Sequence, residues 1–195
     1  MEADRLSDVI RRAQAREPGA FDELVEAYHR RLYGYFYRLT GSRPDAEDLL
    51  QEVFVRVVRV ISGYQHDGRF DAWLFRIAGN LVRDRIRRIQ RSKVGEAPDD
   101  GAGGSDDWWN RTPDESMDAP GDGLDRREQL DRMQTAIEQL PEAEREVILL
   151  RHFSQLSFRE IADSMGTPLG TALARAHRGL TKLRELMNAE ETRPR

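Results

Sequence analysis

The chain has 195 residues, of which 38% are hydrophobic and 34% charged, and its formal net charge at pH 7 is −4. This composition favours a helical protein with one medium or two small domains, and it is too polar for one large core. No apolar run approaches the roughly 20 residues that cross a bilayer, so we expect no membrane insertion. The absence of cysteine excludes disulfides and thiolate metal sites and, together with opening residues that do not suggest a signal peptide, favours a cytoplasmic location.

The charge is unevenly distributed along the chain. Residues 1–91 carry a net +3, residues 92–123 a net −7 and residues 124–195 a net of zero. The acidic segment is rich in Gly, Pro, Asp and Ser and has no helical or alternating period, so we expect a flexible linker. Within it, Trp108 and Trp109 suggest contact with a partner, with a plain solvated spacer as the alternative. The sequence therefore predicts an all-α protein of two small helical domains joined by an acidic flexible linker.

Four helices are expected in the first domain, and the first of them covers residues 4–16. The second begins near Ala20, because apolar residues then recur at three- and four-residue steps until Gly41 ends the helix. Ser42 is a cap candidate for the third helix, whose first turn holds acidic residues that suit the positive helix end. The apolar residues of this third helix occupy more than one stripe, so it buries one face in its own core and offers another to a partner.

The fourth predicted helix, residues 71–91, has a buried side and a polar side. The polar side begins with an aromatic residue, passes an amide and ends in arginines, an arrangement that suits base stacking and phosphate binding. It consists of Trp73, Arg76, Asn80, Arg83, Asp84 and Arg87. A glycine-containing loop precedes this helix, and its Tyr64, His66 and Phe70 can hold an extruded base. The alternative is an amphipathic helix with basic ends and no ligand.

Downstream, we expect a helix over residues 125–138 and another that begins at Pro141. A helix-turn-helix pair follows, because Ser157 and Glu160 form a capping-box pattern and Gly166 supplies a turn with positive φ. Such a pair is found in many proteins that bind duplex DNA.

The second helix of the pair is expected to end near Met187 and carries the candidate contacts with duplex DNA. Thr171, Arg175 and Arg178 lie on one side, at steps of four and three residues. Free amides near Gly170, at the helix start, suit a phosphate, and the two arginines can reach guanine edges or phosphates in the major groove. The alternative is a charged face that is only solvated.

These motifs, in their order, closely resemble one known family over nearly the whole chain. "DAEDLLQEVF" and "FDAWLFRIAGNLVRDRIRR" precede the acidic segment, and "LPEAEREVILLRHFSQLSFREIADSMGTPLGT" follows it. The chain resembles the extracytoplasmic-function group of bacterial sigma factors. The resemblance implies two helical domains, regions two and four, that bind the clamp and flap of RNA polymerase core. It also implies that region two, residues 1–91, melts the minus-ten promoter element and that region four, residues 124–195, reads the minus-thirty-five element.

The resemblance further implies three sets of site residues. The polymerase would contact Asp45, Asp48, Gln51 and Glu52. The minus-ten element would contact Tyr64, His66, Phe70, Trp73, Arg76, Asn80, Arg83, Arg87 and Arg88, with Asn80 and the loop taking a flipped base. The minus-thirty-five element would contact Ser157, Arg159, Thr167, Gly170, Thr171, Arg175 and Arg178. The implied partners are RNA polymerase core, promoter DNA and an anti-sigma factor.

The chain departs from the family pattern at two places. Gly79 stands where arginine is common, and Leu173–Ala174 stands where a basic and a small residue are usual. Both departures reduce the positive charge of surfaces that would bind DNA.

The distance between promoter elements constrains how the two domains are used. Elements about 20 base pairs apart are separated by roughly 65 Å along the duplex. A free linker of 32 residues averages only about 30 Å end to end, although its full reach is about 105 Å. The domains can therefore span a promoter only when another body holds them apart. We also expect the acidic tract to cover basic surfaces of the free protein.

Two other function classes were weighed against this resemblance. A self-sufficient regulator would need a strongly basic or dimeric body, and neither the charge balance nor an obvious coiled coil supplies one. An enzyme acting on nucleic acid would need a catalytic or phosphate-binding arrangement. The histidines are scattered at positions 29, 66, 152 and 177, and no glycine-rich phosphate loop is present. We therefore expect no catalytic residues, no metal and no cofactor.

Overall fold

The computed structural model describes residues 3–93 and 124–191, and every regular element within these ranges is a helix. The first range contains α1 (Ala3–Gln14), α2 (Ala20–Thr40), α3 (Arg43–Val60), the short 3-10 helix η1 (Ile61–Gly63) and α4 (Phe70–Lys93). The second contains α5 (Leu124–Glu138), α6 (Glu142–Ser154), α7 (Phe158–Met165) and α8 (Leu169–Glu191). The all-α prediction is confirmed. The predicted linker, with its tryptophan pair, lies outside the described residues except for the two residues that end α4.

The helix boundaries follow from local chemistry. Gly41 ends α2 with φ at 65°, and its N–H donates to the Tyr37 carbonyl. Ser42 then caps α3, because its side-chain oxygen accepts the Asp45 N–H at 3.4 Å. Gly166 ends α7 with φ at 62°, a conformation that a side chain at this position would strain.

The two described ranges pack together around one continuous core. The buried apolar cluster runs from α1–α4 into the second range through Ile137, Val147, Leu150 and Ile161. The expectation that the chain is too polar for one large core is therefore wrong for the described residues. A chain with 38% hydrophobic residues achieves this because α2 and α6 pack on each other and bury apolar side chains together, although α6 buries Arg145 and Glu146 as well.

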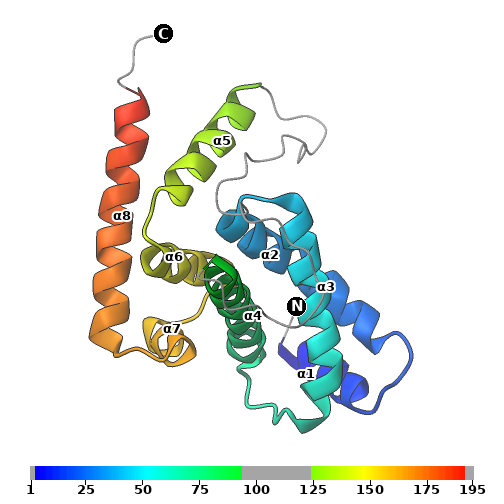
Figure 1. Ribbon diagram of the computed structural model, residues 1–195. Helices are drawn as coiled ribbons and strands as arrows, with labels where there is room; N and C mark the ends of the chain where they lie inside the picture. Colours follow the sequence, from blue (N-terminus) through cyan, green and yellow to red (C-terminus); the bar gives the residue numbers. More distant parts are fainter. Residues whose placement is uncertain (1–2, 94–123, 192–195) are drawn as a thin grey trace.

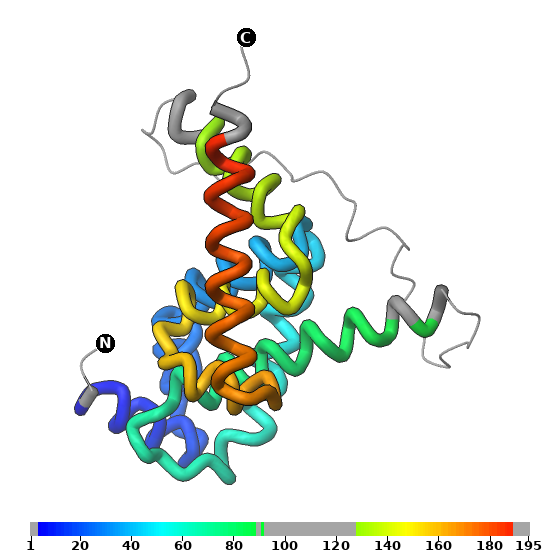
Figure 2. Tube along the Cα trace, turned by 90° about the vertical axis from the view of Figure 1, so that its left-hand side faces the viewer, coloured from blue at the N-terminus to red at the C-terminus, as the bar shows by residue number. Residues whose placement is uncertain are grey.

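Figure 1 shows how this packing arranges the helices. α6 lies between α8 on one side and α2 and α4 on the other, and α7 lies at the end of α4 nearest to α8. In the turned view of Figure 2, α8 stands as a long straight helix on the face toward the viewer, while the C-terminal half of α4 leads away from it. Within the described residues, no helix is long and apolar enough to span a membrane.

Arg145 of α6 joins three helices at the centre of this packing. The side chain is buried, with 6% of its surface exposed. Its guanidinium donates to the Leu39 carbonyl at the end of α2 and to the Leu140 carbonyl, at 3.2 and 3.1 Å, and also to the Glu138 carbonyl at the end of α5. These carbonyls lie at or just after helix ends, where no backbone N–H of the same helix donates to them. The Arg145 guanidinium supplies the missing donors.

We expect Arg145→Leu to lower the free energy of unfolding by about 2–4 kcal/mol, because three buried carbonyls lose their donor while the side-chain volume is roughly kept. Chemical denaturation followed by circular dichroism measures the change. Arg184→Leu, at an exposed position of α8, is the control and should change little. A loss below about 1 kcal/mol at Arg145 would show that water replaces the guanidinium.

Candidate nucleic-acid interface

The loop before α4 is built on a cluster of aromatic rings. Tyr64 lies 4.6 Å from Trp73 and 5.5 Å from Phe70, measured between ring centroids. Gln14 of α1 fixes the loop from behind, because its side-chain amide donates to the carbonyls of Ile61 and Tyr64. The loop is therefore held in one shape by α1 and by its own aromatic residues.

The structure corrects the predicted roles of two loop residues. Phe70 is 1% exposed, so its ring belongs to the core and presents no face to a ligand, whereas Tyr64 is 9% exposed and contributes only a small part of its surface to the cavity beside the loop. Burial also raises the pKa of the Tyr64 phenol to about 12, so it stays protonated at neutral pH. Sequence reasoning could not separate a stacking ring from a supporting one, since both are aromatic residues in the same loop. Their role is to support Trp73, which is half-buried.

An open cavity of about 460 Å³ lies between this loop and the helix-turn-helix. Trp73, Arg69 and Arg76 line one side, and Glu160 and Asp163 of α7 line the other. The wall from the first described range is thus aromatic and carries both Asp67 and two arginines, whereas the wall from the second is acidic. His66 lies at the surface nearby, and its ring nitrogen Nε2 is 2.9 Å from the Ser7 hydroxyl.

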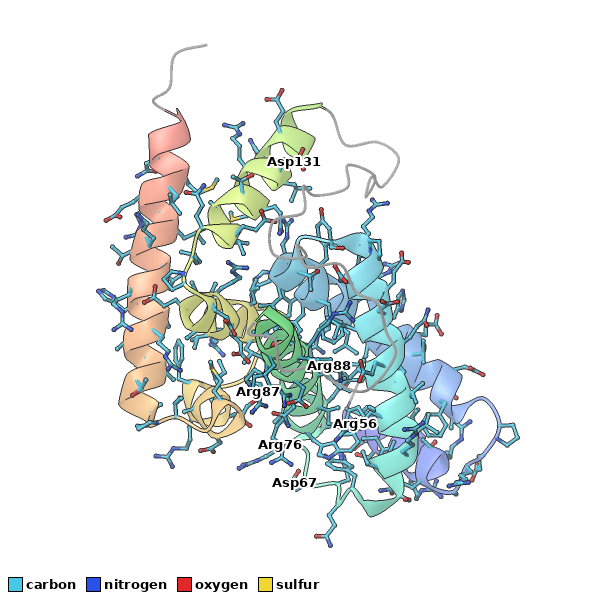
Figure 3. All side chains as sticks on the ribbon, viewed as in Figure 1. Arg56, Asp67, Arg76, Arg87, Arg88 and Asp131 are labelled. Carbon is cyan, nitrogen blue, oxygen red and sulfur yellow. The ribbon has the colours of Figure 1, made fainter. Side chains whose placement is uncertain are left out.

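Several polar side chains of α4 are exposed. These include Arg76, Arg87 and Arg88, which Figure 3 labels. Arg87 pairs with Asp84 at 2.6 Å within the same helix. Asn80 is exposed too, but its amide oxygen accepts a hydrogen bond from Arg83 at 2.6 Å.

Arg83 is the residue of this surface that binds the second described range. Its guanidinium forms an ion pair with Glu146 of α6 and donates to the Ser164 carbonyl of α7 at 3.1 Å. The Glu146 side chain is 7% exposed, and burial raises the pKa of its carboxyl while the Arg83 charge opposes that rise. Arg83 thus contacts the second described range, and its side chain remains only 23% exposed.

The helix-turn-helix forms as its sequence predicts. The capping box is present: the Ser157 hydroxyl accepts the Glu160 N–H, and the Glu160 carboxylate accepts the Ser157 N–H at 2.9 Å. The Ser157 hydroxyl also donates to the Glu160 carboxylate at 2.6 Å, and this hydrogen bond, together with the one from the Ser157 N–H, lowers the pKa of Glu160. Of the other predicted DNA contacts up to the first turn of α8, Arg159 and Gly170 are exposed, whereas the Thr167 hydroxyl is buried and has no hydrogen-bond partner among the described residues.

The start of α8 presents a mixed surface. Thr171 and Arg175 are half-buried, while Arg178 is exposed and pairs with Glu144 of α6 at 2.8 Å. Between them, Leu173 is 44% exposed and Ala174 is also exposed. The outer face of this helix therefore offers few hydrogen-bonding side chains.

On α3, the predicted polymerase contacts separate into exposed and buried residues. Asp48, Gln51 and Glu52 are exposed, but Asp45 is 5% exposed and forms an ion pair with Arg85 of α4. Its position in the first turn, next to the cap, explains the burial, so the predicted partner contact of Asp45 is replaced by an internal one. The same helix also exposes the apolar side chains of Val55 and Val58, at 49% and 47%, as expected for a second face.

Sequence reasoning missed the residues that join the two ranges. Besides Glu146 and Arg145, these are Arg31, whose Nε donates to the Phe153 carbonyl at 2.9 Å, and Arg38, which donates to the Gln134 amide oxygen at 2.9 Å. The sequence did contain a signal for these residues, because each is a charged residue within an otherwise apolar stripe of its helix. Within the described ranges, no group of three or more histidine or acidic side chains is placed to hold a metal ion.

Comparison with known proteins shows to which family this chain is similar. The model of sigma-70 region 2 matches residues 24–92, and that of sigma-70, region 4 matches residues 130–183. The ECF RNA polymerase sigma factor SigE of Mycolicibacterium smegmatis is 38% identical over 168 residues, which cover 86% of this chain and 62% of that protein. The ECF RNA polymerase sigma factor SigW of Bacillus subtilis is 32% identical over 176 residues, which cover 90% of this chain and 93% of that protein.

Two solved structures share the fold. One is CnrH in complex with the cytosolic domain of CnrY, with a TM-score of 0.64 and 24% identity over 96% of this chain and 99% of that one. The other is the sigma factor RpoE in complex with the anti-sigma factor NepR from Bartonella quintana, with a TM-score of 0.67 and 22% identity over 87% and 98%.

The two regions are matched in order along a single chain, and SigW is matched over nearly its whole length. The protein therefore belongs to the extracytoplasmic-function group of the sigma-70 family of RNA polymerase sigma factors.

Proposed function

We propose that this protein binds RNA polymerase core and directs it to a specialised set of promoters, with residues 1–91 as region two and residues 124–195 as region four. The observation that carries the proposal is the presence of both family regions in one chain, in the order that promoter recognition requires. As a sigma factor it acts in transcription initiation. We expect it to act in the cytoplasm, where bacterial core polymerase works, and to have no catalytic activity of its own.

Region two would bind core polymerase through the exposed face of α3. Asp48, Gln51 and Glu52 supply negative charge and hydrogen bonds, while Val55 and Val58 supply exposed apolar area on the same helix. A polar rim next to an apolar patch is the usual composition of a protein interface. Asp45 would contribute indirectly, by fixing Arg85 and the start of the helix.

The α4 surface would bind the minus-ten element. Trp73 offers a ring at the mouth of the cavity, and Arg76, Arg87 and Arg88 offer exposed charges for phosphates. Asn80 lies between them with an amide that can hydrogen-bond a base edge. Arg83 holds the Asn80 amide and is itself paired with Glu146. Both residues would therefore bind DNA only after the ion pair between Arg83 and Glu146 breaks.

Region four would read the minus-thirty-five element with the start of α8. Arg175 and Arg178 would supply the positive charge, and the amides at Gly170 would hold a phosphate. Ser157 and Thr167 would contribute through helix capping and packing, because one is used in the capping box and the other is buried. An anti-sigma factor is a further expected partner, since RpoE, a structure of the same fold, was solved with one.

Run-off transcription with purified core polymerase, with and without the protein, tests this proposal on genomic promoter fragments. We expect transcripts only when core polymerase and the protein are both present. A footprint by the protein alone at physiological salt would instead favour a self-sufficient regulator.

We expect Asn80→Ala to impair promoter opening more than promoter binding, because the amide acts on a base that is exposed only after melting. Opening is measured by the fluorescence of 2-aminopurine placed in the minus-ten element, and holoenzyme binding by filter retention. Arg30→Ala, at an exposed position of α2, is the control. An equal loss of opening and binding would contradict the base-capture role.

We expect Arg178→Ala to weaken holoenzyme binding to all promoters by a similar factor and to reduce the slope of log K against log salt by about one. The physical reason is that an exposed guanidinium at this position contacts a phosphate and releases a counterion. Binding titrations at several salt concentrations measure the slope, with Arg184→Ala as the control. A loss confined to one base-pair sequence would show that Arg178 reads a base instead.

A further inference from the structure

The exposed side of α8 is apolar in its first turns. Leu169 and Leu173 are 39% and 44% exposed, and Ala174 is exposed beside them. Gly170, also exposed, carries no side chain. A single exposed leucine is common on protein surfaces, whereas several adjoining apolar residues indicate a surface that contacts something else.

The other side of the helix is fixed by packing on α6. Ala172, Ala176 and Gly179 are buried and recur at steps of four and three residues. A Cβ atom at Gly179 would lie 2.7 Å from Ile148 Cδ1, so the two helices approach closely there. Because successive residues advance by about 100° around a helix, this packing leaves residues 170, 173 and 174 on the exposed side.

The polar residues of α8 lie beside this apolar surface rather than within it. Thr171 and Arg175 are half-buried, and Arg178 is paired with Glu144 at 2.8 Å. Within residues 168–176, every exposed residue is Pro, Leu, Gly or Ala. The arginines can therefore reach phosphates at the edge of a groove, but the exposed side chains between them offer no hydrogen bond to a base.

The geometry of the helix-turn-helix directs the apolar surface toward base edges. Gly166 makes the turn after α7, and α8 begins at Leu169. Figure 1 shows the start of α8 beside α7. In this motif the second helix lies in the major groove, with its N-terminal residues against the bases. The apolar surface occupies about the first two turns of α8, which is the part that would face them.

Thymine is the base whose major-groove edge carries an apolar group. Its C5 methyl projects into the groove, whereas the edges of adenine, guanine and cytosine present hydrogen-bond donors and acceptors. An apolar side chain against a methyl group removes apolar area from water on both partners. The same side chain against a donor or acceptor leaves that polar group without a partner. An apolar reading surface therefore favours thymine over the other bases.

Gly170 allows the base pairs to approach this surface. A Cβ atom there would meet no atom within 4 Å, so no internal contact requires glycine at this position. Glycine also lowers the stability of a helix relative to alanine. Position 170 neighbours positions 173 and 174 on the helix surface. Its missing side chain leaves room for the flat edge of a base pair next to Leu173 and Ala174.

We propose that Leu173 and Ala174 recognise thymine methyl groups in the minus-thirty-five element, with Arg175 and Arg178 at the flanking phosphates. The proposal rests on the proposed function of region four, and it names the chemistry by which this helix selects a sequence. A basic residue is usual in the family where Leu173 stands. Apolar readout at this position therefore distinguishes the promoters of this protein from those that a basic residue would select.

Replacement of thymine by deoxyuridine tests the proposal, because it removes only the methyl group and keeps base pairing. Holoenzyme assembled from core polymerase and the full-length protein is titrated with promoter fragments that run-off transcription identifies. Each fragment carries deoxyuridine at one thymine of either strand in the minus-thirty-five element. We expect the affinity to fall about fourfold at one or two of these thymines, as for the loss of one buried methyl group. Deoxyuridine in the spacer between the elements is the DNA control and should have no effect.

Variants of the protein assign the effect to one side chain. Leu173→Ala should abolish the fourfold difference, whereas Leu173→Met keeps an apolar side chain of similar volume and should retain it. Leu180→Ala is the matched control, since Leu180 is 49% exposed on the same helix but lies about two turns further along. This control should retain the difference. Circular dichroism verifies that each variant keeps its helices.

Leu173→Arg tests the same position by a gain of charge. It places a cation where the family pattern has one, so it should remove the preference for thymine over deoxyuridine. It should also steepen the slope of log K against log salt by about one, because a further phosphate contact releases a further counterion. An unchanged preference in Leu173→Arg would contradict apolar readout by this residue.

The outcomes separate this proposal from the proposed function. If promoters are transcribed but deoxyuridine has no effect, or has the same effect in Leu173→Ala, the thymine readout is wrong and the proposed function stands. If Leu173→Ala weakens assembly with core polymerase and keeps the deoxyuridine effect, the surface binds protein instead and the proposal is overturned. If no fragment is transcribed, the proposed function is wrong and the thymine readout falls with it.

Discussion

A carboxylate taken out of water needs a cation beside it, and for Glu146 that cation is Arg83 of α4. This ion pair links α6, the helix of the second described range that packs on α2, to α4, the helix that would melt DNA. Glu146 is buried where α6 lies against α4, so this ion pair depends on the packing of the two helices. Two neighbours on α4 are tied to it: Asn80 is held by Arg83, and Gly79 leaves the space in which the carboxylate sits.

The remaining contacts between the regions have a polar and an apolar part. Arg31 and Arg145 reach main-chain carbonyls at helix ends, which water can satisfy equally well after separation. The apolar part is larger, since the core is continuous across α2 and α6. Separation therefore exposes apolar area and costs free energy, which must come from another surface. The exposed apolar residues of α3, Val55 and Val58, are available to bury area against polymerase in exchange.

The sequence was sufficient to predict the helices but insufficient to predict their packing across the acidic segment. Capping residues and apolar periodicity are local, so Ser42, Gly41 and Gly166 marked the helix ends correctly. The contact between α4 and α6 joins residues more than sixty positions apart. The apolar periodicity within a helix carries no information about such a distant pair. For the same reason, Phe70 was taken for a stacking ring and Asp45 for a partner contact, although tertiary packing buries both. Gly79, read as a loss of positive charge at a DNA surface, has its physical reason in the approach of Glu146.

The packing of the two ranges also bears on how the chain meets DNA. α4 and α7 are joined by the hydrogen bond from Arg83 to the Ser164 carbonyl, whereas promoter elements about 20 base pairs apart are separated by roughly 65 Å along the duplex. Both elements are therefore out of reach of this arrangement at one time, and a further body must hold the ranges apart. Residues 1–91 carry a net charge of +3 and residues 124–195 a net charge of zero, so neither range holds enough positive charge to bind a duplex strongly alone, and the body that separates them must also supply binding free energy.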